Sequence, residues 1–256
     1  MDEAAYLQRI NYDGPLAPSA ESLRQLHIAH LLSVPFENLS IHWREPIVLN
    51  DDALFEKVVR RRRGGFCYEL NGLFAALLRS LGFNVTMLSA EVATGEGEFS
   101  QPFAHMTLMV TLEDRWLADV GFGDSFREPL LLDERDPQIQ GDEAFRIEET
   151  ETHLVMSRRS ENGDWKPQYR FTLEPHDYAD YAEMCRYHQT SPQSHFTQKR
   201  ICSLCTIDGR VSLSDMRLIT TRGREREDVE LSTETEYQDV LRQKFGVEVG
   251  SCGSAA

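Results

Sequence analysis

The sequence predicts an α+β protein in which a helical lobe, ending near residue 82, precedes a β-rich lobe. Apolar residues recur every three or four positions up to Leu81, and from Phe83 onward they alternate with polar residues. Turn-forming pairs such as Asn162-Gly163 and Asp208-Gly209 then separate short apolar runs. Helices followed by strands along one chain are typical of an α+β fold.

Two helices are predicted before the central one. The first extends from Ser19 to Leu32 and must end before Pro35, because proline disfavours helical geometry in the residue that precedes it. The second begins at Asp51 or Asp52, which would cap it, and continues through Val59.

The third helix carries a cysteine in its first turn. The stretch RRRGGFCYELNGLF places Cys67 after two glycines, and a helical pattern follows and stops before Gly82. That pattern consists of Leu70, Leu73, Phe74, Leu77, Leu78 and Leu81. Amide groups in a first turn have no intrahelical partner, so the helix dipole is expected to lower the pKa of the Cys67 thiol and favour the nucleophilic thiolate. A cysteine that packs as a small buried hydrophobe is the alternative.

The second half of the chain is predicted to be mainly β-structure. The expected strands are 83–87, 106–112, 144–149, 152–158 and 165–173, and the expected loops are 94–102 and 133–142. A helix is expected from Tyr178 to Tyr187. A strand hairpin is expected at Asp208-Gly209, followed by a helix that the Thr233-x-x-Glu236 capping box opens and that ends before Gly246.

Composition limits the class of protein. The 256 residues are 41% hydrophobic, enough for a sizeable core, and the net charge of −15 argues against binding to nucleic acid or to an anionic membrane. The N-terminal sequence has neither a basic region nor an apolar run of the kind that targets secretion, so we expect a cytoplasmic protein. Its five cysteines are an odd number in a long chain, and reduced thiols are expected.

A catalytic cysteine needs a base and a group that orients the base. His105 opens a predicted strand and faces away from its apolar side. If Leu112 to Asp114 form a three-residue hairpin loop, Asp119 lies diagonally from His105 on the same face, about 7–8 Å away between Cβ atoms and within reach of an imidazole. A two-residue loop would place the two side chains on opposite faces. Taken singly, His105 could be a hydrogen-bonded strand histidine and Asp119 a turn residue.

These residues lie in sequence blocks that resemble one enzyme family. The blocks are VPFENL (34–39), RGGFCYELN (63–71), AHMTLMV (104–110), DVGFG (119–123) and SPQSHF (191–196). Together and in this order, the blocks resemble the signature blocks of the arylamine N-acetyltransferases. The resemblance covers about residues 6–245. The segment from about Ile201 onward is the most divergent.

The resemblance implies a fold and a reaction. It implies a helical bundle over 1–82, an antiparallel β-barrel over 83–190 and an α/β lid over 191–256, around a core like that of cysteine proteases and transglutaminases. It further implies that Cys67 is the nucleophile, His105 the base and Asp119 the orienting carboxylate. Acetyl-coenzyme A would acetylate Cys67, and an aromatic amine or hydrazine would then take the acetyl group in a ping-pong reaction without a metal.

Further site residues are candidates for contact with the substrates. An aromatic slot for the amine is expected from Phe36, Phe103, Phe122 and Phe126, each of which could instead pack in the core. Coenzyme A contacts are expected at Gly121, Gly123, Phe196 and Thr206, the glycines because they let a ligand approach the backbone.

Backbone donors and charged side chains complete the expected site. The oxyanion is expected to meet the Cys67 amide and a second donor near Phe103. A buried Arg63–Glu37 ion pair is expected to tie the helices together, with an exposed arginine as the alternative. Arg60 to Arg62 are expected to form a solvated face.

Three other interpretations remain open from the sequence. Cys185-x-x-His188 with Cys202-x-x-Cys205 has the ligand types of a structural zinc site. The same three catalytic groups could serve a cysteine hydrolase. A third possibility is an amide synthase that takes its acyl group from a carrier protein.

Overall fold

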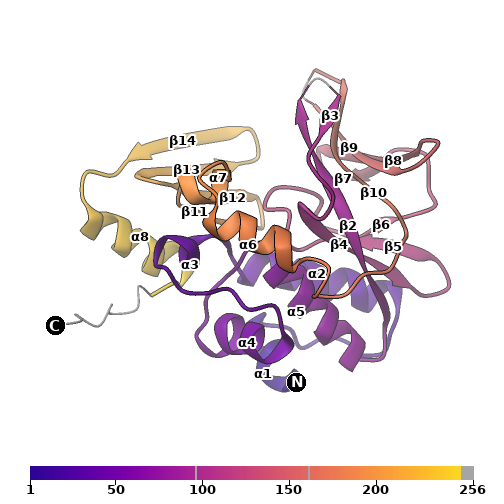
Figure 1. Cartoon of the computed structure of the whole chain (residues 1–256), viewed down its shortest axis with the longest axis horizontal. Helices are drawn as coiled ribbons and strands as arrows, with labels where there is room; N and C mark the ends of the chain where they lie inside the picture. Colours follow the sequence, from indigo (N-terminus) through magenta and orange to yellow (C-terminus); the bar gives the residue numbers. More distant parts are fainter. Residues whose placement is uncertain (96, 161, 249–256) are drawn as a thin grey trace.

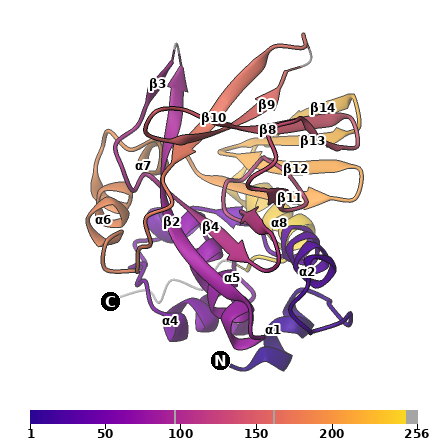
Figure 2. The same ribbon diagram turned by 90° about the vertical axis from the view of Figure 1, so that its right-hand side faces the viewer.

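The computed structural model describes residues 1–95, 97–160 and 162–248, and it shows an α+β protein with two antiparallel sheets standing above the N-terminal helices (Figures 1 and 2). The N-terminal helices are α1 Glu3–Arg9, α2 Ala20–Ser33, α3 Leu39–His42, α4 Asp51–Phe55, the π-helical turn η1 Glu56–Arg60, and α5 Cys67–Ser80. Of the helices described, none is both long and apolar enough to span a bilayer.

The helix boundaries follow from their capping residues. Ser19, the first residue of the predicted helix, lies just before α2 and caps it by accepting a hydrogen bond from the amide of Ser22. The predicted aspartate cap of α4 is wrong, because Asn50 accepts the amide of Ala53 and so takes the capping position. The predicted single helix through Val59 continues from α4 into the π-helical turn.

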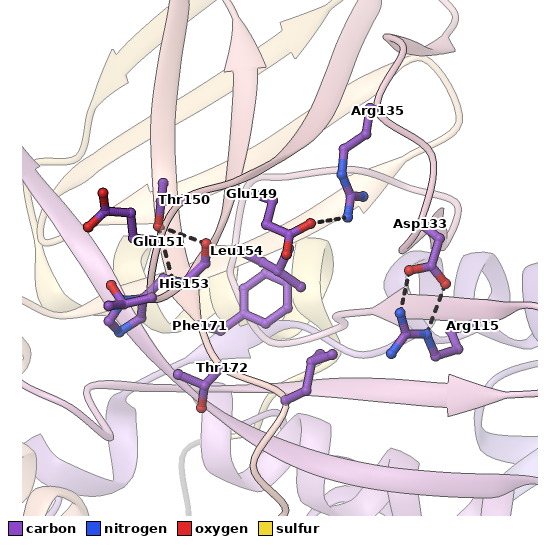
Figure 3. A pocket seen from close by; sticks show the side chains of 12 residues that line it. Arg115, Asp133, Arg135, Glu149, Thr150, Glu151, His153, Leu154, Phe171 and Thr172 are labelled. Atoms are coloured by element: carbon purple, nitrogen blue, oxygen red, sulfur yellow. Dashed lines mark hydrogen bonds and ion pairs between the residues drawn. The ribbon is translucent and has the colours of Figure 1, made fainter.

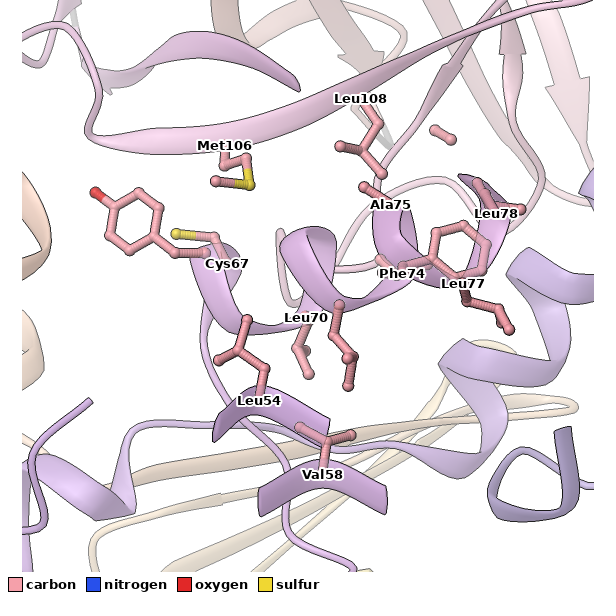
Figure 4. Close-up of a cluster of buried hydrophobic side chains, with 14 of the residues drawn as sticks. Leu54, Val58, Cys67, Leu70, Phe74, Ala75, Leu77, Leu78, Met106 and Leu108 are labelled. Carbon is pink, nitrogen blue, oxygen red and sulfur yellow. The ribbon is translucent and has the colours of Figure 1, made fainter. Parts of the chain in front are cut away.

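Helix α5 lies at the centre of the core. Leu54 and Val58 pack on one side of it, and Met106 and Leu108 of strand β4 pack on the other (Figure 4). Because both sides of α5 contact apolar elements, every residue from Cys67 to Leu78 is buried. The position of the Cys67 end is therefore set by packing on two sides.

The larger sheet has the strand order β6-β5-β4-β2-β10-β9-β8-β7, with β3 paired to β2. Its strands are β2 Asn84–Gly95, β3 Glu98–Phe99, β4 His105–Thr111, β5 Arg115–Ala118, β6 Leu130–Leu131, β7 Gln138–Gln140, β8 Glu143–Glu149, β9 Leu154–Arg159 and β10 Trp165–Phe171. The predicted strands are present, with boundaries within two residues of the prediction except at the end of β2, which continues eight residues beyond residue 87. The two predicted loops are wrong in part, since β2 reaches Gly95, β3 forms after it, and β7 lies within 133–142.

Two glutamine side chains nearly close this sheet into a barrel. Gln138 accepts the amide of Leu131 and donates to its carbonyl, at 2.8 and 2.9 Å, so its side chain replaces one step of a strand ladder. Gln140 does the same for the neighbouring segment by accepting the amide of Glu128 and donating to its carbonyl. Side-chain amides thus join the terminal strands β6 and β7, and the polar edges that an open sheet would expose are partly satisfied.

The C-terminal part forms a second, five-stranded sheet of order β1-β11-β12-β13-β14. Its elements are β1 Phe36–Glu37, α6 Ala182–Thr190, α7 His195–Gln198, β11 Ile201–Thr206, β12 Gly209–Ser214, β13 Arg217–Arg222, β14 Glu225–Glu230 and α8 Glu234–Phe245. The predicted hairpin at Asp208-Gly209 and the Thr233 cap of α8 are confirmed, whereas β13 and β14 went unpredicted. We call the β11–β14 sheet with α8 the lid, and its β1 strand comes from the N-terminal region.

Candidate active site

Cys67 is the first residue of α5 and is 3% exposed. Phe66 precedes it in an extended conformation, and the Glu69 carboxylate accepts the Phe66 amide at 3.1 Å, which holds the start of the helix. The glycine before this turn is required by close packing. A Cβ atom at Gly64 would lie 2.0 Å from the carbonyl oxygen of Pro35. The Gly-Gly pair therefore lets the chain pass beneath Pro35 and enter the helix at Cys67.

His105 and Asp119 form a buried pair on the β4–β5 hairpin. Leu108 pairs with Ala118 across the hairpin, so of the two loop lengths that the sequence allows the structure has the three-residue one, Leu112 to Asp114. His105 Nε2 lies 2.6 Å from Asp119 Oδ2, and both side chains are almost fully buried. Because Nε2 faces the carboxylate, Nδ1 is the ring nitrogen that is left to accept a proton from elsewhere.

Asn71 joins the cysteine helix to this pair, and the sequence analysis gave it no role. Its Nδ2 donates to Asp119 Oδ1 at 2.8 Å and to the carbonyl of Met106 at 2.6 Å, while its Oδ1 accepts the amide of Val120. Asn71 follows Cys67 by four positions, so the two share one face of α5. This spacing from the cysteine was the available signal in the sequence.

The Asp119 carboxylate is stabilised in its charged form. Burial opposes ionisation, but His105 and the hydrogen bonds from Asn71 and the Gly121 amide together hold the pKa of Asp119 below its usual value. The carboxylate therefore remains charged and can orient the imidazole.

The expected low pKa of the Cys67 thiol is wrong. Burial raises the pKa of Cys67 well above its usual value, and backbone hydrogen bonding from Met106 and Tyr68 offsets this only in part. Removal from water disfavours the thiolate more strongly than the start of one helix favours it. Burial thus opposes ionisation of the thiol, which needs a nearby base to become nucleophilic.

Four phenylalanines were expected to wall an amine slot, and the structure separates them. Phe122 is half-buried and lies edge-on to the His105 ring, with centroids 5.1 Å apart. Phe36 packs beside Gly123, which adopts a φ of +91°. Phe126 is 1% exposed and stacks on His27, so it packs as a core residue.

Phe103 has its backbone held in place, with a φ of +64°. Its amide donates to Ser89 Oγ at 2.8 Å, and its carbonyl accepts the Tyr68 hydroxyl at 2.6 Å. The Phe103 amide is therefore already used and is not a second oxyanion donor.

The residues expected to contact coenzyme A also have contacts within the protein. A Cβ atom at Gly121 would lie 2.8 Å from Cys67 Cα, so this glycine allows the hairpin to approach α5 and not a ligand. Phe196 is 8% exposed and packs against Phe66. The Thr206 carbonyl accepts from Arg127 at 2.9 Å.

The predicted buried ion pair is confirmed and belongs to a larger cluster. Arg63 Nη2 lies 2.8 Å from Glu37 Oε1, and Arg63 is 2% exposed. Lys57 adds a 2.6 Å contact to Glu69, the residue that holds the start of α5. Three buried charges and the half-buried Lys57 thus compensate one another near the Cys67 turn. Arg60 and Arg61 are exposed, as predicted.

Two other features of the molecule lie outside this site. A polar pocket is lined by Arg115, Asp133, Arg135 and Glu149, among others, and contains two ion pairs. Cys67, His105 and Asp119 are not among its described lining residues (Figure 3).

Within residues 1–95, 97–160 and 162–248, no three His, Cys, Asp or Glu side chains converge as metal ligands, so the alternative zinc site does not form. Cysteines 67, 185, 202 and 205 are unpaired, and Cys252 lies outside the described residues.

The chain matches known proteins over nearly its whole length. A family model described as N-acetyltransferase matches residues 19–253. Arylamine N-acetyltransferase 2 of Mus musculus is 36% identical over 273 residues, which cover 96% of this chain and 94% of the mouse protein. The structure of arylamine N-acetyltransferase from Salmonella typhimurium is 30% identical with a TM-score of 0.92, covering 98% of this chain and 93% of its own.

A solved complex gives a third comparison. The structure of Mycobacterium marinum arylamine N-acetyltransferase in complex with CoA is 31% identical with a TM-score of 0.88, and it covers 96% of this chain and 93% of its own. Sequence and structure thus agree over almost the full length of both chains. On these grounds the chain belongs to the arylamine N-acetyltransferase family.

Proposed function

We propose that this acyltransferase moves an acetyl group from acetyl-coenzyme A to an aromatic amine or hydrazine through an acetyl-Cys67 thioester. The observation that carries the proposal is the 2.6 Å contact between His105 Nε2 and Asp119 Oδ2, tied by Asn71 to the helix that begins at Cys67. A thiol, an imidazole and an orienting carboxylate are the three groups that nucleophilic catalysis by cysteine requires. The CoA complex of the Mycobacterium marinum relative supports the choice of donor.

The first stage acetylates the enzyme. Cys67 Sγ gives its proton to His105 Nδ1, and the thiolate attacks the acetyl carbon of the thioester. The bond to the coenzyme A sulfur breaks, and that sulfur leaves with the proton. Because burial opposes ionisation of the thiol, this proton transfer depends on the base being in place. The Cys67 amide, at the first position of α5, supports the oxyanion.

The second stage transfers the acetyl group to the amine. The amine nitrogen attacks the acetyl-Cys67 carbon, His105 takes the proton from nitrogen, and the Cys67 sulfur leaves and is reprotonated. Asp119 remains ionised and stabilises the imidazolium. Because the donor product leaves before the acceptor reacts, the kinetics are of the ping-pong type.

Substrate contacts are proposed on the basis of position. Phe122 lies against His105 and is our candidate for the wall of the amine slot, with Phe36 and Phe103 as neighbours. For coenzyme A we propose Gly123, Phe196 and Thr206 near the lid. Cys67 starts a helix that packs on an antiparallel sheet bearing the base, and we infer from this a core of the cysteine-protease and transglutaminase type. We expect the enzyme to act in the cytoplasm.

The decisive experiment supplies acetyl-coenzyme A without an amine. One equivalent of free coenzyme A should appear in a burst. Intact-protein mass spectrometry should find one added acetyl group, and peptide mass spectrometry after digestion should locate it on the Cys67 peptide. An arylamine or hydrazine should then remove the label and restore turnover. Cys67→Ala should show neither burst nor label.

Two other outcomes would change the assignment. Continued release of coenzyme A at the burst rate would indicate a hydrolase. A folded protein that never gains the acetyl group would reject acetyl-coenzyme A and favour a carrier-bound acyl donor.

A further inference from the structure

His27, in the middle of α2, is completely buried and has no part in the steps above. Its Nε2 lies 3.0 Å from the backbone nitrogen of Asp119, and its Nδ1 lies 2.7 Å from the carbonyl oxygen of Arg127. The ring also stacks on Phe126, with centroids 5.8 Å apart and planes inclined by 14°, and lies edge-on to Phe74. Both ring nitrogens are therefore engaged, and the ring packs against two phenylalanines.

The two hydrogen bonds define the tautomer of His27. An amide can only donate, so Nε2 must accept from Asp119, and the ring proton must sit on Nδ1, where it is donated to Arg127. Burial lowers the pKa of His27 to about 4, which keeps the ring neutral near pH 7. The titratable groups whose charges act on this ring are Asp119 and the neighbouring His30.

The hydrogen bond that His27 accepts holds the backbone amide of Asp119, whereas the other contacts hold the Asp119 carboxylate. Asn71 and the Gly121 amide donate to Asp119 Oδ1, and His105 contacts Oδ2. A carboxylate can rotate about its side-chain bonds while keeping some of these contacts. Fixing the Asp119 amide sets the position from which the carboxylate projects toward His105.

Arg127 extends this chain of contacts to the lid. Its guanidinium donates to the carbonyls of Thr206, Ile207 and Gly209, at 2.9, 2.8 and 3.0 Å, and so holds the turn between β11 and β12. Its own carbonyl accepts from His27. The lid turn, Arg127, His27, Asp119 and His105 are thus joined by consecutive contacts of 3.0 Å or less.

We propose that His27 is a positioning residue for the Asp119–His105 pair, and that Arg127 makes this positioning depend on the docked lid turn. The inference rests on the proposed role of His105 as the base for Cys67. A purely structural role, in which His27 only fills space between α2 and the barrel, is the competing explanation.

The test measures alkylation of Cys67 by iodoacetamide as a function of pH, which reports proton transfer to His105 without acetyl-coenzyme A. His27→Phe keeps the ring stacking but removes both hydrogen bonds. Cys67 of this variant should be alkylated at least about 10-fold more slowly at pH 7. Its pH profile of alkylation should shift toward that of His105→Gln, which lacks the base. His27→Gln places an amide oxygen near the Nε2 position and should restore the wild-type profile. His27→Asn reaches only the Arg127 side and should not.

His30 offers a matched control on the same helix. It is buried, and its Nδ1 contacts the Tyr6 hydroxyl at 2.9 Å. His30→Phe should lower the melting temperature yet leave the alkylation profile unchanged. A wild-type profile in His27→Phe overturns the proposal. If that variant does not fold, equal profiles for His27→Gln and His27→Asn overturn it instead.

A double-mutant cycle tests the link to the lid. Arg127→Met removes the three contacts to the turn and should slow alkylation in the same direction as His27→Phe. The double variant should be no slower than His27→Phe alone, because both changes interrupt one chain of contacts. Additive effects reject the coupling through Arg127. A wild-type protein that alkylates normally at Cys67 but is never acetylated would reject the acetyl-coenzyme A function and leave this inference standing.

Discussion

Asn71 Nδ2 lies 2.8 Å from Asp119 Oδ1, so the helix that begins with the nucleophile is hydrogen-bonded directly to the carboxylate of the hairpin. The same amide group contacts the carbonyl of Met106, which follows His105 in the chain. One side chain therefore sets the distance between two elements that supply different catalytic groups. It is the side-chain contact that ties α5 directly to the Asp119 carboxylate, whereas the Tyr68–Phe103 hydrogen bond joins the helix only to the segment before β4.

Asn71→Ala should lower kcat by about 10- to 100-fold while KM for acetyl-coenzyme A changes little, because misalignment of the reacting groups affects the transition state most. Asn38→Ala is the matched control, since Asn38 is also buried and its side chain donates to Phe196 and Lys199 near the lid. The control should lose stability but keep its rate of Cys67 alkylation. The rate of Cys67 alkylation should therefore fall in Asn71→Ala only. An equal fall of the alkylation rate in both variants would contradict a specific role for Asn71.

His105→Gln should expose the raised pKa of the buried Cys67 thiol. Without the base, alkylation by iodoacetamide should rise about 10-fold per pH unit from pH 6 to 9, because only the thiolate reacts. The wild-type rate should vary much less between pH 6 and 8, since the thiol and imidazole share the proton. Identical profiles for the two proteins would remove His105 from the role of base.

Phe122→Ala should separate the two stages of the reaction. The side chain lies against His105 on the side of the barrel, so its loss should weaken the use of arylamines while the burst of coenzyme A is retained. Rapid-quench measurement of each stage provides the check. A variant that is impaired equally in both stages would show that Phe122 is structural.

Arg63→Met should destabilise the fold by about 3–5 kcal/mol, because it leaves the buried Glu37 carboxylate without its arginine partner. Arg60→Met, three residues earlier, removes an exposed arginine from an i,i+4 pair with Glu56 and should change the free energy of unfolding by less than about 1 kcal/mol. Urea denaturation of both variants would give the difference. Similar midpoints would mean that the buried cluster contributes little.

Stability should fall as the pH decreases from about 7 to 4. The pKa of His27 is lowered to about 4 in the folded protein, whereas an unfolded histidine titrates near 6.5. The unfolded chain therefore binds the proton first, and this one group should reduce the free energy of unfolding by roughly 3 kcal/mol over that range. His27→Gln should show a correspondingly shallower dependence in urea denaturation at pH 7, 5.5 and 4.

The sequence by itself determined the features that depend on neighbouring residues. Periodicity identified α2, α5 and most strands, and a three-residue loop at Leu112 to Asp114 was one of two hairpin geometries that the sequence left open. That loop in turn placed His105 and Asp119 on one face, because a strand alternates its side chains with a period of two. The family blocks supplied the identity of the nucleophile and the expected reaction. The division of the chain at residues 82 and 190 remains a prediction.

The tertiary structure alone decided how these elements meet. Asn71 and His27 contact Asp119 across 48 and 92 residues of chain. The spacing from Cys67 places Asn71 on the cysteine face of its helix but does not identify Asp119 as its partner, and no local pattern signals His27. The pKa of Cys67 was predicted in the wrong direction because the start of a helix is visible in the sequence, while the depth of its burial is not. The sequence also did not show that the side chains of Gln138 and Gln140, in place of backbone hydrogen bonds, join β7 to the segment around β6. Burial and long-range hydrogen bonds depend on which surfaces pack together, and that is settled only when the whole chain has folded.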